Sequence, residues 1–320
     1  MELLQITQSP WEGVMDRLLR RCRIQSRLLR ECLAEFFGVY ILILFGCGSV
    51  AQVTTSGNTK GDYLSINLGF ALGTMFGIYI ARGVSGAHLN PAVSLSLCVL
   101  GRFSWTRLPF YVCSQLFGAF LAAATVALQY YDAIVDFSGG HLTVSGSTAT
   151  AGIFSTYPAD YLSVWGGVTD QIIGTAALLV CVLALGDAGN TPPPAGLEPV
   201  LVGAAVLVIG ISMGSNSGYA INPARDFGPR LFSFVAGWGD EVFRAGHGWW
   251  WVPLLVTCIG ALVGCFLYEL LIGAHHPDDL PMVETAEKEA GHEQLSCDTI
   301  TTKEKNEVFN TPSNIFLSAS

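Results

Sequence analysis

Long apolar runs separated by short polar segments dominate the middle of the chain. A helix needs about 20 apolar residues to cross the hydrocarbon core of a bilayer. Six windows have roughly that length, and they lie near residues 33–53, 63–81, 108–130, 166–186, 199–215 and 249–272. This pattern predicts an all-α membrane protein with six transmembrane helices.

Two further stretches are too short to span a bilayer. They begin at Asn90 and Asn222 and continue for about 12 residues each. As a helix, such a stretch measures about 18 Å, a little over half of the hydrocarbon core. A segment of this kind can enter a membrane only where protein or a water-filled cavity surrounds its irregular backbone. Both stretches are therefore predicted to be re-entrant half-helices.

The two halves of the chain repeat each other. Ser85–Ala92 reads SGAHLNPA and Ser217–Ala224 reads SGYAINPA, with five identical positions. Each half, about 32–131 and about 166–272, thus holds three spans and one half-span. Because three is odd, the halves enter the membrane with opposite orientation. The sequence predicts an inverted repeat around a pseudo-two-fold axis in the membrane plane.

Each half-helix begins with an Asn-Pro-Ala triplet. Asparagine is a preferred N-cap, and proline is favoured at the first helical position. In an inverted repeat the two N-termini face each other near the bilayer midplane, where their dipoles repel cations. A water molecule held by both asparagine amides would donate its own hydrogens outward, which interrupts proton transfer. The six residues of the two triplets are Asn90, Pro91, Ala92, Asn222, Pro223 and Ala224.

These paired triplets resemble those of the major intrinsic proteins, or aquaporins, and the resemblance covers about residues 30–272. The run Asn222–Asp226, together with Gly83–Val93 and Phe227–Leu231, is similar to the aquaglyceroporin branch, in which an aspartate commonly follows the arginine. The resemblance implies an aquaporin-like fold of six helices and two half-helices around one pore per subunit, in a homotetramer.

The resemblance also implies a selectivity filter made of Phe70, Gly210, Tyr219 and Arg225. Arg225 carries a charge within the membrane domain, where charges are costly and usually functional, and it offers fixed donors to hydroxyl oxygens. Phe70 and Tyr219 can present apolar faces to a carbon backbone, and Gly210 adds no side chain that would narrow the opening. Such a filter suits an elongated polyol. A lipid-facing or core position is the alternative for Phe70.

Three polar residues are candidate supports for the loops. By resemblance, Glu35 in the first span accepts hydrogen bonds from the backbone of the re-entrant loop, whereas a snorkelling position near the membrane edge is the alternative. Gln171 is its counterpart in the second half, where an acidic residue is common. We expect its amide oxygen still to accept, with Asp170 beside it as a second candidate. Asp226 is the third support.

His88 precedes Asn90 by two residues. A histidine bonded to nearby backbone is one interpretation. The other is that His88 titrates near about pH 6 and adjusts the cytoplasmic half of the pore. No metal site and no cofactor are predicted, because the nine cysteines form no CxxC pair and His275-His276 has no further ligand spaced to join it.

Charged residues are concentrated at the two ends of the chain. They make up 13% of the 320 residues, about half the share in a soluble domain. The chain divides into a basic segment 1–31, a pore-forming membrane domain 32–272 and an acidic tail 273–320 that we expect to be disordered. The net charge of −9 argues against nucleic acid as a partner.

The basic residues predict the orientation in the membrane. With six spans, both ends lie on one side, and that side holds all Lys and Arg residues except Lys60, Arg225, Arg230 and Arg244. Basic loops are cytoplasmic, so both termini are predicted to be cytoplasmic and residues 131–165 to form a long outer loop. No retention signal ends the tail, which favours the plasma membrane.

The sequence thus predicts a passive channel that conducts water, glycerol and other small neutral solutes such as urea, and excludes protons and ions. No catalytic arrangement is present in the sequence, so an enzyme is not expected. Two alternatives remain. A secondary transporter also uses inverted repeats and broken helices, and a structural junction protein could carry a vestigial pore.

Overall fold

The computed structural model describes residues 10–277, apart from residue 195, and the regular elements of these residues are all helical. One compact unit closes at Ala274, and a second begins at His275. The acidic tail was predicted for 273–320, and its residues from 278 onward lie outside the described range.

Six long helices coincide with the six predicted windows. They are α2 (Arg27–Thr55), α3 (Tyr63–Ser85), α5 (Leu108–Gln129), α7 (Val164–Leu185), α8 (Glu198–Met213) and α11 (Thr257–Leu271). Within the described residues, five helical segments are long and apolar enough to cross a membrane: α2, α3, α5, α7 and Val252–His275, which contains α11. The sixth, α8, is apolar but has 16 residues, or about 24 Å of helix.

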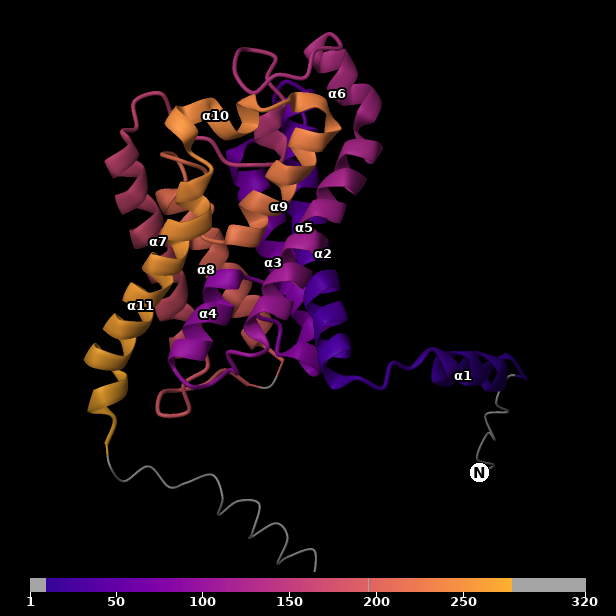
Figure 1. The fold of residues 1–320 in the computed structure, drawn as a ribbon. Helices are drawn as coiled ribbons and strands as arrows, with labels where there is room; N and C mark the ends of the chain where they lie inside the picture. Colours follow the sequence, from indigo (N-terminus) through magenta and orange to yellow (C-terminus); the bar gives the residue numbers. More distant parts are fainter. Residues whose placement is uncertain (1–9, 195, 278–320) are drawn as a thin grey trace, which may run out of the picture. The chain divides into compact units, whose positions relative to one another are not determined.

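The two predicted half-helices are α4 (Pro91–Val99) and α9 (Pro223–Ser233). Figure 1 shows them in the middle of the bundle, surrounded by the long helices. The repeats interlock through them. α4 from the first half packs on α11 of the second, and α9 from the second half packs on α5 of the first. Neither half can therefore enclose its own half-helix without the other.

The remaining elements are short. They are α1 (Pro10–Cys22), α6 (Tyr131–Ser138), α10 (Glu241–Gly248), the 3-10 turns Ala151–Ile153 and Gly273–His275, and the π-helical turns Phe234–Trp238 and Val252–Val256. The segment predicted as a long outer loop thus begins with a helix, α6. Ile134 on α6 is buried against the core, and Gly139, at φ 60°, ends the helix.

The first long helix begins earlier than the apolar pattern predicts. Ser26 caps it, with the side-chain oxygen accepting from the backbone N–H of Leu29. Glu31 in the second turn is buried, but it accepts from Arg27 at 2.8 Å and from Arg107 at 3.2 Å. These arginines neutralise the carboxylate, and the helix extends back from the apolar window to Arg27.

Glycines set two equivalent helix crossings, one in each repeat. A Cβ atom on Gly118 of α5 would overlap the carbonyl oxygen of Phe36 on α2. A Cβ atom on Gly260 of α11 would lie 2.7 Å from the carbonyl oxygen of Ile172 on α7. The helices approach this closely only because both positions lack a side chain. Phe36 and Ile172 directly follow Glu35 and Gln171, so the crossings fix the height of these two polar residues.

We expect Gly118→Ala and Gly260→Ala each to destabilise the bundle by about 1–3 kcal/mol, because the added methyl group forces two backbones apart. Thermal unfolding in detergent, followed by size-exclusion chromatography, measures the effect. Gly48→Ala on α2 is the matched control, because its Cβ atom would meet open space. Equal melting temperatures for all three variants would contradict this account of the crossings.

Candidate functional site

Two asparagines join the half-helices at their N-termini. The Oδ1 atom of Asn90 accepts from the backbone N–H of Ala92 at 2.9 Å, and that of Asn222 accepts from Ala224 at 2.9 Å. Their amide nitrogens cross to the opposite loop: Asn90 donates to the carbonyl of Ile221 and Asn222 to that of Leu89, both at 2.9 Å. Each amide has a second N–H, and both asparagines line one cavity.

The loops before the asparagines have the same strained backbone. Equivalent residues have positive φ angles in both halves: 87°, 54° and 51° at Gly86, Ala87 and Leu89, and 76°, 41° and 43° at Gly218, Tyr219 and Ile221. For a β-branched residue such as Ile221 this conformation is an outlier. Each strained residue costs on the order of 1–3 kcal/mol and persists only where its surroundings hold it.

Glu35 holds the first loop. Its side chain is fully buried. One oxygen accepts from the hydroxyl of Ser85 at 2.6 Å and from the backbone N–H of His88 at 2.9 Å. The other accepts from the backbone N–H of Leu89 at 2.7 Å and from the amide of Gln115 at 2.8 Å. The carboxylate therefore binds the loop backbone and does not reach the membrane edge.

Gln171 occupies the equivalent place in the second half. Its Oε1 atom accepts from the backbone N–H of Ile221 at 3.1 Å, and its Nε2 atom donates to Ser217 at 2.7 Å. The adjacent Asp170 accepts from Ser217 at 2.6 Å and from Asn216 at 2.9 Å. An amide and a neighbouring carboxylate thus share the contacts that one carboxylate makes in the first half.

Two cavities adjoin each other and share part of their lining. The larger, of about 290 Å³, is lined by the loops before α4 and α9, and the smaller, of about 240 Å³, by α2, α3 and the loop before α7. Among the described residues they share three lining side chains, Phe70, Tyr219 and Arg225. We refer to these three residues as the constriction.

The constriction has an aromatic side and a cationic side. The rings of Phe70 and Tyr219 meet edge to face, with centroids 6.2 Å apart and planes at 78°. The Cζ atom of Arg225 lies 4.4 Å from the centroid of Phe70, a cation–π contact. Arg225 is 7% exposed and lines both cavities, so the cavity surface carries guanidinium donors beside aromatic carbon. A solute with hydroxyls on one edge and CH groups on the other matches both sides.

Gly210 lies beside a ring of the constriction. It lines neither cavity. A Cβ atom there would lie 2.8 Å from Cζ of Tyr219 and 2.5 Å from Oδ1 of Asn67. The missing side chain therefore leaves room for the Tyr219 ring. Gly46 plays the same part for Phe70, whose ring would overlap a Cβ atom at that position.

The loop between α6 and α7 fixes Arg225. The guanidinium donates from Nη1 to the carbonyl of Phe154 at 3.0 Å. Phe154 is itself fully buried, with its ring packed edge to face on Phe232 and Trp238. A loop distant in sequence thus determines where the arginine of the constriction points.

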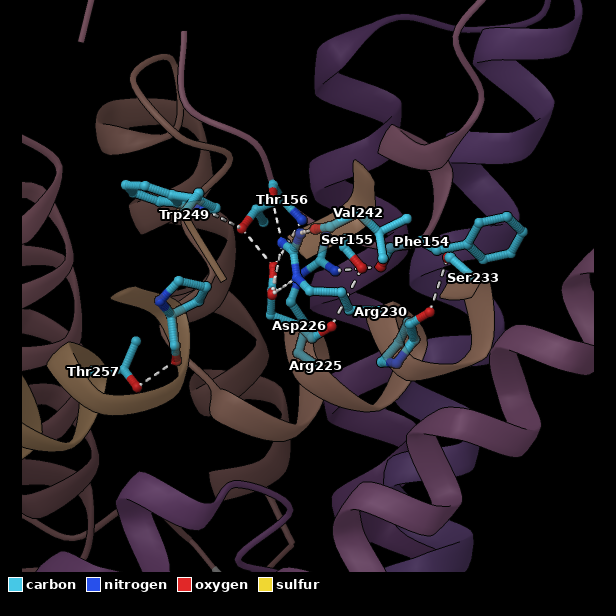
Figure 2. A network of polar contacts seen from close by, with 12 residues as sticks. Phe154, Ser155, Thr156, Arg225, Asp226, Arg230, Ser233, Val242, Trp249 and Thr257 are labelled. Atoms are coloured by element: carbon cyan, nitrogen blue, oxygen red, sulfur yellow. Dashed lines mark hydrogen bonds and ion pairs between the residues drawn. The ribbon is translucent and has the colours of Figure 1, made fainter. Parts of the chain in front are cut away.

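The same loop is clamped by Asp226, as Figure 2 shows. The buried carboxylate accepts from Thr156, at 2.7 Å from its backbone nitrogen and 2.5 Å from its hydroxyl, and from Arg230 at 2.9 Å. Arg230 is fully buried and donates to the carbonyls of Thr156 and Val242, both at 2.6 Å. Trp249 donates to the Thr156 hydroxyl at 3.2 Å. Asp226 therefore supports the loop that holds Arg225.

The sequence did not indicate three residues that hold Arg225 and the loop beside it: Phe154, Thr156 and Arg230. The spacing of Asp226 and Arg230, four residues apart on one helix, is a signal for an ion pair that could have identified Arg230. No comparable local pattern marks Phe154 or Thr156, because their partners lie about 70 residues further along the chain.

His88 lines the larger cavity, as do Arg102 and Glu198. Its Nδ1 atom is 3.0 Å from the hydroxyl of Ser94, and its ring packs on Phe103 and Tyr111 at centroid distances of 4.6 and 5.0 Å. Its side chain thus bonds to a hydroxyl and to rings, while its backbone N–H binds Glu35.

The electrostatic character of the site is positive. Two helix N-termini and Arg225 face the cavities, whereas Glu35 and Asp226 are occupied by donors. No group of three or more metal-ligating side chains occurs in the part of the chain that the structure describes. The arrangement can donate hydrogen bonds to neutral solutes and repel cations.

Comparisons with known proteins agree with this arrangement. The model of the major intrinsic protein family matches residues 23–268. The chain is 52% identical to Aquaporin-10 of Homo sapiens over 272 residues, which is 85% of this chain and 89% of that protein. It is 47% identical to Aquaporin-9 of Homo sapiens over 281 residues, or 88% and 95%.

The solved structures include a similar fold. The X-ray structure of the aquaglyceroporin from Plasmodium falciparum matches with a TM-score of 0.70 and 33% sequence identity, over 77% of this chain and 97% of that one. The matches in sequence and in structure both cover the interlocked repeats that form the two cavities. The chain belongs to the major intrinsic protein family.

Proposed function

We propose that the chain is a passive channel for water, glycerol and other small neutral solutes such as urea. The observation that carries this proposal is the constriction, where the rings of Phe70 and Tyr219 and the guanidinium of Arg225 line both cavities. The names of similar proteins, which include an aquaglyceroporin, support the same solute class.

The constriction acts as the selectivity filter in this proposal. Carbon atoms of a polyol pass against Phe70 and Tyr219, and its hydroxyls accept from Arg225. Beyond the filter, the solute or water accepts from the second N–H of Asn90 and Asn222. Because these donors replace hydration at each step, a neutral hydroxyl compound crosses without a large desolvation barrier.

Ions and protons are excluded by charge and by hydrogen-bond direction. The two helix N-termini and Arg225 place positive potential in a low-dielectric passage, which raises the energy of a cation. A water molecule that accepts from both asparagine amides donates outward on both sides. It cannot relay a proton along a continuous chain.

The rival functions require features that the described residues use otherwise. A secondary transporter needs a coupling-ion site near the midplane, but the carboxylates of Glu35 and Asp170 accept hydrogen bonds from the loops. A junction protein would not need an arginine at the meeting point of two cavities. Solute flux that is independent of any ion gradient separates the channel from the transporter.

The proposal extends to assembly and location. We infer a homotetramer of four independent pores in the plasma membrane, surrounded by lipid, with both termini in the cytoplasm. The family resemblance supports the tetramer, and the basic residues near the N-terminus support the orientation.

Stopped-flow light scattering on proteoliposomes tests the solute class. A glycerol gradient should produce shrinkage followed by fast reswelling, whereas a sucrose gradient should produce shrinkage alone. Gly210→Ala should lower glycerol permeability by roughly tenfold, which corresponds to about 1.4 kcal/mol of added barrier. Water permeability should fall by a smaller factor. The added methyl group pushes the Tyr219 ring toward the lumen.

The double variant Gly210→Ala/Tyr219→Ala should recover most of the glycerol flux, because the displaced ring is gone. Gly48→Ala, with open space around its Cβ atom, is the control and should match the wild type. Water flux without glycerol flux in the wild type would refute the glycerol assignment and leave a water pore.

Arg225→Gln should admit cations and protons while glycerol still passes, because the variant keeps hydrogen-bond donors and loses the charge. We expect proton flux into liposomes, read by a trapped pH-sensitive dye, to rise at least roughly tenfold. Arg244→Gln is the control, because Arg244 is 73% exposed in its ion pair with Asp240. Unchanged proton flux in Arg225→Gln would assign exclusion to the half-helices alone.

His88→Gln tests whether His88 makes the pore sensitive to pH. A protonated ring adds a donor beside Ser94 and a positive charge that interacts with Glu35 and Glu31, which should change how it packs on Tyr111. Glycerol permeability of the wild type should therefore change by at least about twofold as the pH falls from about 7.5 to below about 5.5, and that of the variant should not. Identical pH profiles would leave His88 with a purely structural role.

A further inference from the structure

The N-terminal segment contains a helix with two distinct faces. Within α1, apolar residues recur at intervals of three and four: Trp11, Val14, Met15, Leu18, Leu19 and Cys22. At 100° per residue these positions form one continuous stripe. Arg17, Arg20 and Arg21 share the opposite face by register, with Glu12 and Asp16 on its other flank. Such a helix is amphipathic and asymmetric in charge.

The apolar stripe of α1 is open where the structure describes its side chains. Leu18 is 52% exposed and Leu19 is 61% exposed. Transfer of both leucine side chains from water into an apolar medium is favourable. The helix therefore has a face suited to an apolar medium that the bundle does not supply.

The chain itself holds α1 near a membrane surface. Four residues, Arg23–Ser26, separate its last residue from α2, which is a span. Fully extended, four residues reach about 14 Å. The C-terminal end of α1 therefore stays within about 14 Å of the start of α2 and so remains close to the membrane surface that α2 enters.

Positive charge is dense on both sides of this connection. Between Pro10 and Arg30 there are six arginines and two acidic residues. Arg27 is engaged with Glu31, whereas Arg17, Arg21 and Arg23 are exposed. Near an anionic bilayer surface each such arginine changes a binding equilibrium by roughly fivefold.

We propose that α1 lies in the headgroup region of the adjoining leaflet and binds anionic phospholipid through Arg17, Arg21 and Arg23. Its apolar stripe enters the acyl boundary, and its basic face stays with the phosphates. This role goes beyond solute conduction. It does not depend on the proposed pore, because it requires only that α2 spans the membrane.

A basic amphipathic helix also fits the groove of a helix-binding protein. The tether favours the membrane: the lipid surface is already within reach of α1, whereas a soluble partner would have to displace α1 from that surface. The continuation of arginines to Arg30, in the first turns of α2, is also typical of a juxtamembrane lipid-binding segment.

Hydrogen–deuterium exchange of the full-length protein in nanodiscs tests the proposal. Discs of phosphatidylcholine alone are compared with discs in which roughly a third of the lipid is phosphatidylserine. Backbone amides of α1 should exchange at least tenfold more slowly in the anionic discs. Arg17→Gln, Arg21→Gln and Arg23→Gln combined should abolish this difference, and the three Arg→Lys changes should retain it.

A second variant separates insertion from charge. Leu18→Ser combined with Leu19→Ser should restore fast exchange in both kinds of disc, because the stripe can no longer enter the acyl boundary. Equal exchange of the wild type in both discs would overturn the proposal. A competition experiment would also overturn the proposal. In it, calcium-loaded calmodulin, a helix-binding protein used as a probe, would slow exchange of α1 in the anionic discs by a larger factor than the anionic lipid itself does. Glycerol flux is measured on the same variants and should be unchanged, so a failure here is distinct from a failure of the channel.

Discussion

A backbone N–H or C=O group inside a bilayer needs a hydrogen-bond partner from the protein or from water in a cavity. This protein starts two helices near the middle of the bundle, which leaves the first N–H groups of each helix and the irregular loops before them without helical partners. Asn90 and Asn222 cap the helices and cross-link the two loops. Glu35 and Gln171 bind the loop backbones from behind. The donors and acceptors left over face the cavity, so the requirement that constrains the fold also produces the polar lining of a passage.

The two repeats satisfy the same requirement with different chemistry. One carboxylate, Glu35, serves the first loop, whereas the second loop uses Gln171 for the backbone and Asp170 for the neighbouring hydroxyl and amide. The neutral amide of Gln171 keeps the hydrogen bond to the backbone of Ile221. The carboxylate of Asp226 is paired with Arg230, so the positive charge of Arg225 is not neutralised by it.

Interactions between residues close together in the sequence explain the features that the sequence predicted correctly. Caps, proline positions and apolar windows act within a few residues, so the six helices and both half-helices coincide with the predicted segments. The turns of α2 that precede the apolar window near 33–53 could not be inferred from that window, because Arg107, a partner that neutralises Glu31, lies 76 residues away. The clamp of Phe154 and Thr156 on α9 was missed for the same reason. Its contacts arise only when the long loop folds back over the second repeat, and a single sequence carries no periodic signal for such a contact.

The constriction shows how residues outside the passage can set its shape. Gly46 and Gly210 line neither cavity, but each provides the space into which one aromatic ring of the constriction fits. Phe154 also lies outside both linings, although its carbonyl orients Arg225. The position of each constriction residue is therefore fixed from behind, by a missing side chain or by a backbone oxygen. A change in any of these supports alters the opening without changing its chemistry. It follows that the types of the constriction residues determine which solutes can hydrogen-bond there, while the glycines and the loop determine which of those solutes fit.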